Sequence, residues 1–477
     1  MQHAILTLNI RLKSMSNKFA DFWLNRYNLT NNKGVEYMDL LEQKITTVKA
    51  RLKKEFLADT RPWVVTFSGG KDSTTVLQLV VEMLLDLNTE EKDLKKVYVV
   101  SSDTGVEMPI IEDYTTNKID QINDFIQASN INMQVNILKP KVTESFWTLL
   151  LGKGYPSPNQ TFRWCTDRMK IKPATTFLKS LTEKNESILM LLGVRSDESQ
   201  ARAESIAKRD ENHRGFSKHS EIPNAFVFSP VKDWTNADVW TYLSKHPAPW
   251  GEHTDMTKLY DKGSGEADCN IALNPEAASC GKTRFGCWVC TVVSKDKSMA
   301  NMLRNKGDEW MMPLNSFRNK LEEYRYDHSK RQPRRRNGQK SVGPFLLSVR
   351  KELLKELLSI EKKLIDLEKM GSKKLISDDE IAQIQLEWLH DGDFFETAIA
   401  MAQDVNRLID YTSVKSFDEK ERNYIDSLCE ENEIPTKLIE DLMQKEHSYR
   451  HQIKRTKIFT EMENLVENFA NGVVNEI

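Results

Sequence analysis

The stretch Trp63-Val-Val-Thr-Phe67, followed at once by Ser68-Gly-Gly-Lys-Asp-Ser-Thr74, decides the fold of this chain. The short apolar run indicates a buried strand, and Asp72–Leu87 carries apolar residues at helical spacing. The two glycines let the backbone pass close to a ligand, and the free N–H groups at the start of the helix attract negative charge. A strand, a glycine turn and a helix in this order predict a phosphate-binding loop.

The side chains of this loop suit the pyrophosphate of ATP. Serine and threonine hydroxyls are hydrogen-bond donors, and Lys71 supplies a cation for a phosphate oxygen. An ordinary glycine turn before a helix would not need these polar residues, and the loop is too short for a Walker A motif. We expect Lys71 and Asp72 to be catalytic as well. The predicted nucleotide contacts in the loop are Ser68, Gly69, Gly70, Lys71, Asp72, Ser73 and Thr74.

Strand and helix patterns alternate after this loop. Apolar runs at 97–101, 134–138 and 188–194 predict further strands, and residues 110–128 predict a second helix. Alternation of this kind is typical of an α/β fold with an open, mostly parallel sheet and helices on both faces.

The remaining chain divides by composition. We predict a helical N-terminal segment (1–60), a nucleotide domain (61–250), a cysteine-rich segment (251–300) and an α-helical C-terminal region (301–477). In the last region, helical periodicity covers residues 346–367, 381–408 and 440–469.

The bulk properties are typical of a water-soluble protein. Hydrophobic residues make up 39% of the 477 residues and charged residues 29%. No apolar run is long enough for a membrane span, and the N-terminus lacks the features of a signal peptide, so we expect a cytoplasmic protein without a membrane partner. The net charge of −2 hides a basic stretch, 318–350, with ten Lys and Arg against three acidic residues.

Polar residues follow two of the other predicted strands. The carboxyl ends of parallel strands face the ligand crevice of an open α/β sheet. Asp103 is therefore expected to bind ribose, adenine or a magnesium ion, or else to cap the helix after Met108. Gly193 and Arg195 follow the fourth strand, and Arg195 and Arg202 are placed to pair with phosphates unless this run is only a solvated loop. We expect Asp103 and Arg195 to be catalytic too.

Four of the six cysteines follow the spacing C-x10-C-x6-C-x2-C: Cys269, Cys280, Cys287 and Cys290. In a chain without an export signal, such a group indicates a metal site rather than disulfides, and a reducing compartment. Four thiolates fit either zinc or an iron–sulfur cluster, and ligand type alone does not separate them. Cys429 falls in a predicted surface helix and is interpreted as structural.

Cys165 stands apart, in Arg163-Trp-Cys-Thr-Asp-Arg-Met-Lys170. The flanking Arg163, Arg168 and Lys170 are expected to lower the pKa of its thiol. We predict a catalytic role for Cys165.

The loop Ser68–Ser73 resembles the signature of the PP-loop ATP pyrophosphatases, which include tRNA thiolases and phosphoadenylylsulfate reductases. The resemblance implies an adenine nucleotide α-hydrolase-like fold and cleavage of ATP between its α and β phosphates. Within this superfamily, several strings look like those of the DndC family, the sulfurtransferases of bacterial DNA phosphorothioation. They are residues 101–107, 164–166, 193–199 and 279–293.

The DndC resemblance implies a function. It implies ATP with magnesium and a 4Fe-4S cluster as cofactors, sulfur delivered by a cysteine desulfurase, and DNA whose non-bridging phosphate oxygen is replaced by sulfur. It also implies other Dnd proteins, of the DndD and DndE type, as partners. Whether the modified DNA is double- or single-stranded stays open. The basic residues Lys330, Arg331, Arg334, Arg335, Arg336 and Lys340 would contact DNA phosphates without reading sequence, unless they form only a solvated charge run.

Alternatives remain for Cys165 and for the activity. Cys165 resembles a cluster cysteine of sulfonucleotide reductases, so it is either a ligand in place of Cys280 or a persulfide carrier or nucleophile. The rival functions are a tRNA thiolase, a phosphoadenylylsulfate reductase, which the intact loop disfavours, and a nucleotide- and redox-sensing DNA-binding module without turnover.

Overall fold

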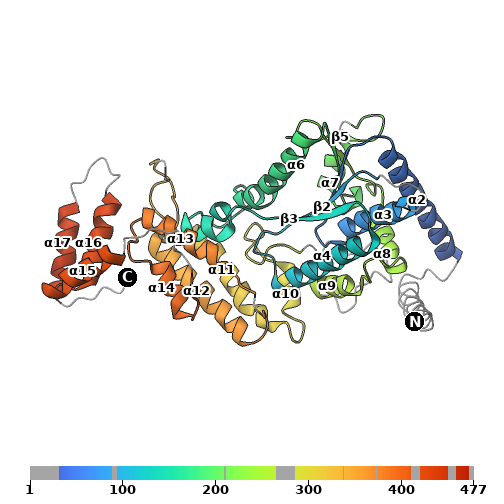
Figure 1. The fold of residues 1–477 in the computed structure, drawn as a ribbon. Helices are drawn as coiled ribbons and strands as arrows, with labels where there is room; N and C mark the ends of the chain where they lie inside the picture. Colours follow the sequence, from blue (N-terminus) through green and yellow to red (C-terminus); the bar gives the residue numbers. More distant parts are fainter. Residues whose placement is uncertain are drawn as a thin grey trace.

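The fold is described from a computed structural model (Figure 1), which covers residues 32–88, 94–208, 211–264, 285–336, 338–371, 373–409, 419–449 and 458–471. Its centre is a six-stranded sheet in the order β3-β2-β1-β4-β6-β5, in which only β5 runs antiparallel to its neighbour. The strands are β1 (Trp63–Thr66), β2 (Val97–Ser102), β3 (Met133–Leu138), β4 (Ile188–Leu191), β5 (Ser217–Lys218) and β6 (Ala225–Phe228).

Helices cover both faces of this sheet, because alternate residues of each strand point to opposite sides. Trp63 and Val65 of β1 pack in one hydrophobic cluster, and Val64 packs in another. The first cluster takes in α2 (Asn32–Leu57), α3 (Lys71–Asn88), α4 (Pro109–Ser129) and α8 (Asn236–Lys245). The second takes in α6 (Lys172–Lys184). The predicted α/β fold is therefore confirmed.

Several predicted elements differ in detail. The fourth strand ends at Leu191 rather than at residue 194, and the short strands β5 and β6 had no sequence prediction. The predicted helix 381–408 is two helices, α13 (Asp378–His390) and α14 (Thr397–Asp404). Gly392 and Glu396 have φ values of +97° and +54° between them, which an α-helix cannot accommodate.

Besides these two clusters on the sheet, a further hydrophobic core lies mainly in the helical region after the sheet. It contains α11 (Met312–Tyr326), α12 (Leu347–Asp366), α13 and α14. Residues 146–151 of the α/β part belong to the same core, and the indole N–H of Trp147 donates to the carbonyl of Leu375 at 2.7 Å. Met299 and Met302 belong to this core as well, so the core extends across residue 301, where we predicted a domain boundary.

The last helices form a separate group, at one end of the molecule in Figure 1: α15 (Glu419–Glu431), α16 (Thr436–Tyr449) and α17 (Ile458–Ala470). Helices α16 and α17 take up the ends of the predicted helix 440–469, and the residues between them lie outside the described ranges. Cys429 is buried on α15. Within the described residues, no helix has the length and apolar character needed to span a membrane.

Candidate functional site

A cavity of about 700 Å³ opens at the carboxyl ends of the parallel strands. Residues 68–73 and the tips of β2 and β4 line one part of it, and residues 285–287 line another. The cavity therefore joins the predicted phosphate loop (residues 68–74) to the cysteine-bearing segment.

The phosphate loop is shaped by its own hydroxyl groups. The Ser73 hydroxyl accepts a hydrogen bond from the Ser68 amide at 3.2 Å and donates to the Gly70 carbonyl at 2.9 Å. Gly69 has φ +71°, the left-handed region that favours glycine. Helix α3 begins at Lys71, so its first N–H groups are directed to the loop and the cavity, where an anion binds best.

Thr74 does not have the role that we predicted for it. Its hydroxyl donates to the Gly70 carbonyl at 2.9 Å, and it is not among the residues that line the cavity. Since it lies one residue further into α3, the helix turns its side chain away. Thr74 therefore fixes the loop rather than contacting the nucleotide.

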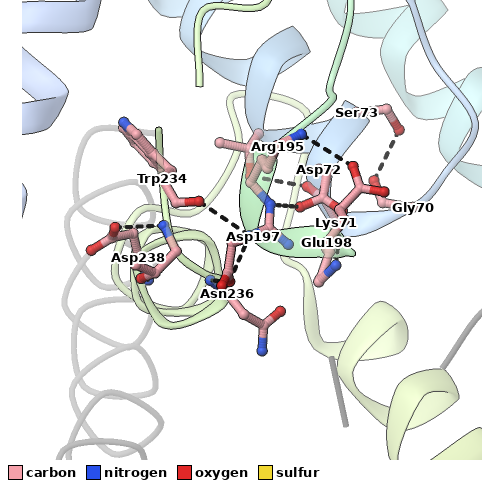
Figure 2. A network of polar contacts seen from close by, with 12 residues as sticks. Gly70, Lys71, Asp72, Ser73, Arg195, Asp197, Glu198, Trp234, Asn236 and Asp238 are labelled. Carbon is pink, nitrogen blue, oxygen red and sulfur yellow. Dashed lines mark hydrogen bonds and ion pairs between the residues drawn. The ribbon is translucent and has the colours of Figure 1, made fainter. Parts of the chain in front are cut away.

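The Asp72 carboxylate lies between two cations (Figure 2). Its Oδ2 accepts from Lys71 Nζ at 2.8 Å, and its Oδ1 accepts from Arg195 Nε at 2.5 Å. Burial lowers the pKa of Lys71, and the charge of Asp72 opposes that shift. Lys71 and Asp72 both line the cavity.

Arg195 is also placed differently from our prediction. Its side chain is only 1% exposed, it does not line the cavity, and its Nη1 donates to the Trp234 carbonyl at 3.2 Å and pairs with Asp197 at 3.3 Å. Arg195 therefore pairs with Asp72 from outside the cavity, and its guanidinium is not free to pair with a phosphate there. Arg202 does line the cavity, and it pairs with Glu198 at 3.5 Å.

Gly193 is required by a close backbone approach. A Cβ atom at this position would lie 2.6 Å from the carbonyl carbon of Asp72 and from the amide nitrogen of Ser73. Real side chains do not occupy such space, so the tip after β4 can rest against the start of α3 only because residue 193 has no side chain.

Asp103 lines the cavity at the tip of β2. Its Oδ1 accepts from the Gly105 amide at 2.9 Å, and its Oδ2 pairs with Lys139 at 2.9 Å. Helix α4 has no side-chain cap at Met108, so the alternative that Asp103 caps this helix is wrong.

Three cysteines lie close together beside the cavity, although Cys165 is more than a hundred residues from Cys287 and Cys290 in the sequence. Cys287 lines it and lies 3.6 Å from the Thr104 hydroxyl, and the Cys290 amide donates to the Cys287 carbonyl at 3.0 Å. Cys165, on the short helix α5 (Trp164–Thr166), is near enough to Cys290 for the two thiols to interact electrostatically. We call Cys165, Cys287 and Cys290 the cysteine group.

The expected low pKa of Cys165 is wrong. Burial raises the pKa of this thiol, and the Cys290 thiol raises it further. Arg168 turns away to the Glu144 carboxylate at 2.7 Å. Burial likewise raises the pKa of Cys287 to about 12, helped by the Glu107 carboxylate. Neighbours in sequence are therefore a poor guide to the charge that surrounds a thiol.

The cysteine group provides donors of the kind that an iron–sulfur cluster needs. Cys165 and Cys287 pack against a core that contains the buried, apolar Trp164, Trp288 and Val289. Cys269 and Cys280 lie outside the described residues, and within them no three His, Cys, Asp or Glu are arranged to hold a metal ion. A 4Fe-4S cluster takes one thiolate on each of four irons, so its ligands are spread more widely than those of a single ion. The donor chemistry therefore fits such a cluster, for which the described residues would supply three of the four thiolates.

Arg318 holds the cysteine loop from the helical region. Its side chain is 1% exposed, and it donates to the carbonyls of Cys290 at 2.8 Å and Ser294 at 3.0 Å, and to that of Val293. Although Arg318 opens the basic stretch, it is a buried structural cation and not a surface one.

The rest of the basic stretch is partly structural too. Antiparallel bridges join Arg331 to Phe345 and Arg334 to Lys340 within this stretch. Arg331 is buried and donates to the Gly343 carbonyl at 2.7 Å, so its predicted DNA contact is wrong. Arg336 donates to the Lys153 carbonyl at 2.9 Å and remains exposed. The other exposed cations are Arg334, Arg335 and Lys340, with Lys330 half-buried.

Two residues that line the cavity, Tyr260 and Glu107, were not predicted from the sequence. The Tyr260 hydroxyl accepts from the Lys71 amide at 3.4 Å, and burial raises its pKa to about 12. It lies 189 residues from Lys71, and nothing in the sequence around it indicates this contact. Glu107 lines the cavity beside Cys287, with its carboxylate accepting from the Thr104 hydroxyl at 2.5 Å. It lies within the quoted string 101–107, which could have identified it.

Comparisons with known proteins agree with the α/β part. Residues 62–293 match the family model of the phosphoadenosine phosphosulfate reductase domain. The uncharacterized protein MJ0066 of Methanocaldococcus jannaschii is 27% identical over 49% of this chain and 40% of its own length. Adenosine 5'-phosphosulfate reductase of Salinibacter ruber is 26% identical over 30% of this chain and 48% of its own.

A solved structure of Candida glabrata FMN adenylyltransferase, with FAD and inorganic pyrophosphate, is 15% identical and covers 53% of this chain and 70% of that one, with a TM-score of 0.31. The chain spans less than half of the length of these two curated relatives. The matched region, 62–293, contains all six strands of the described sheet, so the similarity to this family and the observed α/β fold cover the same part of the chain.

Proposed function

We propose that the protein is an ATP-dependent sulfurtransferase, which cleaves ATP between its α and β phosphates to activate a phosphate oxygen for replacement by sulfur. One observation carries this proposal: a single cavity is lined by the phosphate loop and by the Cys287 thiol. Nucleotide activation and sulfur chemistry can then act on one bound substrate without its release.

The first step follows from the loop. An oxygen of the acceptor attacks the α phosphorus of ATP, a new P–O bond forms, and the bond to the bridging oxygen breaks. Pyrophosphate leaves with the electron pair of that bond. The start of α3 and Lys71 would stabilise the charge on the leaving group, since preorganised donors act most strongly where charge develops. Magnesium would enter with the phosphates of ATP, as it commonly does.

The second step joins the activated oxygen to the cysteine group. A poor leaving oxygen has become part of AMP, so a sulfur nucleophile can displace AMP from phosphorus. Cys165, Cys287 and Cys290, with a ligand from outside the described residues, would hold a 4Fe-4S cluster. When bound, the cluster would supply a site for sulfide. The walls of the cavity near Cys287, which include Phe285, would keep water from the activated phosphate.

DNA as the acceptor rests on the resemblance to the DndC family and on the exposed cations of the hairpin 331–345. Arg334, Arg335 and Lys340 are available to phosphates, and contacts of this kind position a duplex without reading its sequence. A cysteine desulfurase would supply the sulfur as a persulfide, and a thiol reductant would release it as sulfide while being oxidised to a disulfide. Proteins of the DndD and DndE type would be partners.

A sulfonucleotide reductase is the second candidate. The family match over residues 62–293 and the similarity to the Salinibacter enzyme favour it. Such an enzyme would bind an adenylyl sulfate and would not cleave ATP. The complete loop Ser68–Ser73, with Lys71 and Asp72 in the cavity, favours ATP cleavage instead.

The test compares products. Purified protein, with its cluster reconstituted and with DNA and a cysteine desulfurase present, should convert ATP to AMP and pyrophosphate and yield DNA with phosphorothioate-linked dinucleotides. Cys287→Ser should abolish the sulfur product while ATP binding persists. Sulfite formation from an adenylyl sulfate, without pyrophosphate release from ATP, would establish the reductase instead.

A further inference from the structure

The Asp72 carboxylate is shared by two cations that differ in freedom. Lys71 and Arg195 each take one oxygen of it, at 2.8 and 2.5 Å. Arg195 is fixed further by the Trp234 carbonyl and by Asp197, whose Oδ2 also accepts from the Asn236 amide at 2.7 Å at the start of α8. The Lys71 ammonium forms its ion pair with Asp72, and the charge of Glu198 also acts on it.

The two cations also differ in their access to the cavity. Lys71 and Asp72 line it, whereas Arg195 does not. An incoming phosphate can therefore reach Lys71 but not Arg195. To meet a phosphate, however, Lys71 must leave Asp72, whose side chain is only 17% exposed. A half-buried carboxylate left without a cation is costly, so the departure of Lys71 needs a second cation that stays.

We propose that Arg195 is a positioning residue that keeps Asp72 neutralised, so that Lys71 can transfer its ion pair from Asp72 to a phosphate of the nucleotide. The inference rests on the proposed binding of ATP and explains why a buried arginine lies behind the loop. With Lys71 on the phosphate, the Asp72–Arg195 pair is neutral and complete. Without Arg195, Asp72 competes with the phosphate for Lys71.

The carbonyl of Trp234, just before helix α8, connects the Arg195–Asp72 pair to that helix. Thr235 caps α8 in a reciprocal capping box with Asp238, and Asp238 pairs with Lys44 of α2 at 2.8 Å. The network of Figure 2 thus anchors Arg195 to elements that do not touch the cavity. Arg195 can stay in place while Lys71 moves.

A double-mutant cycle with ATP binding as the readout tests the transfer. The probe is the ATP analogue with a methylene group between its α and β phosphorus atoms, measured by calorimetry against the full-length protein. Arg195→Gln should weaken binding about tenfold, equivalent to about 1.4 kcal/mol. Asp72→Asn alone leaves Lys71 without its competing carboxylate, and its measured affinity is the reference for the double variant.

The decisive variant combines both changes. Asp72→Asn in the Arg195→Gln background should restore most of the lost affinity, since the competitor for Lys71 is gone. A purely structural role for Arg195 predicts that the double variant is as weak as, or weaker than, Arg195→Gln, and that result would overturn the proposal. Adenosine, which has no phosphates, should bind all four proteins equally; a loss of adenosine binding in Arg195→Gln would also count against it.

Arg195→Lys keeps the test valid if Arg195→Gln does not fold. It retains a cation for Asp72, so the analogue should bind close to wild type, and a tenfold loss would contradict the proposal. Failure of the proposed function is a separate outcome, since the wild-type protein would then bind neither the analogue nor ATP.

Discussion

The phosphate loop and the cysteine group face the same cavity, yet they are held in different ways. The loop is closed by its own hydroxyl groups and by a network behind it that stays within the α/β part. The cysteine group is assembled from segments more than a hundred residues apart, and Arg318 of the helical region fixes its loop. The nucleotide side is therefore held within the α/β part, whereas the sulfur side also depends on the helical region.

The largest expected effect comes from Arg318→Met, which removes the hydrogen bonds between the helical region and the cysteine loop. Its loss leaves the carbonyls of Cys290 and Ser294 without donors, and we expect the free energy of unfolding to fall by about 3–5 kcal/mol. Hydrogen exchange should rise around residues 287–294 while ATP binding persists. Arg335→Met, an exposed arginine of the same basic stretch, is the matched control. Equal effects of the two variants would contradict the role of Arg318 in fixing the cysteine loop.

Acidification should affect the nucleotide side next. His253 hydrogen-bonds Gln78 of α3 at 2.8 Å, and burial lowers its pKa to about 4 from 6.5. Below pH 6.5 the unfolded chain binds a proton that the folded chain does not, so stability is full above pH 6.5 and decreases towards pH 4, by about 3 kcal/mol at most. Denaturation midpoints across this range measure it. His253→Gln should flatten this part of the pH profile, and an unchanged slope would refute the assignment.

Gly193→Ala tests how closely the strand tip approaches the loop. The added Cβ would meet the backbone of Asp72 and Ser73 at 2.6 Å, so we expect about 2 kcal/mol of destabilisation and weaker ATP binding. Gly286→Ala is the matched control, because it lines the same cavity with nothing within 4 Å of its added Cβ. The interpretation fails if both alanines are equally tolerated in thermal unfolding and in ATP titration.

The smallest effect concerns the hairpin. Replacing Arg334 and Arg335 with glutamine should weaken DNA binding for all sequences and reduce the salt slope by about two, one for each phosphate contact. Lys179→Gln with Lys184→Gln on α6, two exposed cations far from the hairpin in sequence, should leave the slope unchanged. Fluorescence anisotropy against salt concentration distinguishes the two pairs, and identical slopes would remove the hairpin from the DNA surface.

The contrast also explains what the sequence could predict. The sequence brought residues 68–73 and Asp103 of the β2 tip to one candidate site, and both line the cavity, because each lies in a continuous string at the end of a strand. The roles of Arg195 and Arg318 were not predicted, since a surface cation and a buried one look alike in sequence and only the fold brings Asp72 or the Cys290 carbonyl beside them. The meeting of Cys165 with Cys290 likewise depends on the packing of Trp164 and Trp288 in one core. Local strings therefore predict binding loops, but not the long-range contacts that position them.

The bond at which ATP is cleaved is the most direct test of the proposed ATP-dependent sulfurtransferase. ATP labelled at its γ phosphate is incubated with the cluster-loaded protein, the sulfur donor and DNA, and the labelled product is separated by chromatography. The account predicts labelled pyrophosphate together with AMP, and a loss of both in Lys71→Met, because Lys71 faces the cavity from the phosphate loop. Labelled inorganic phosphate with ADP, from protein free of pyrophosphatase and unrelated ATPases, would contradict it.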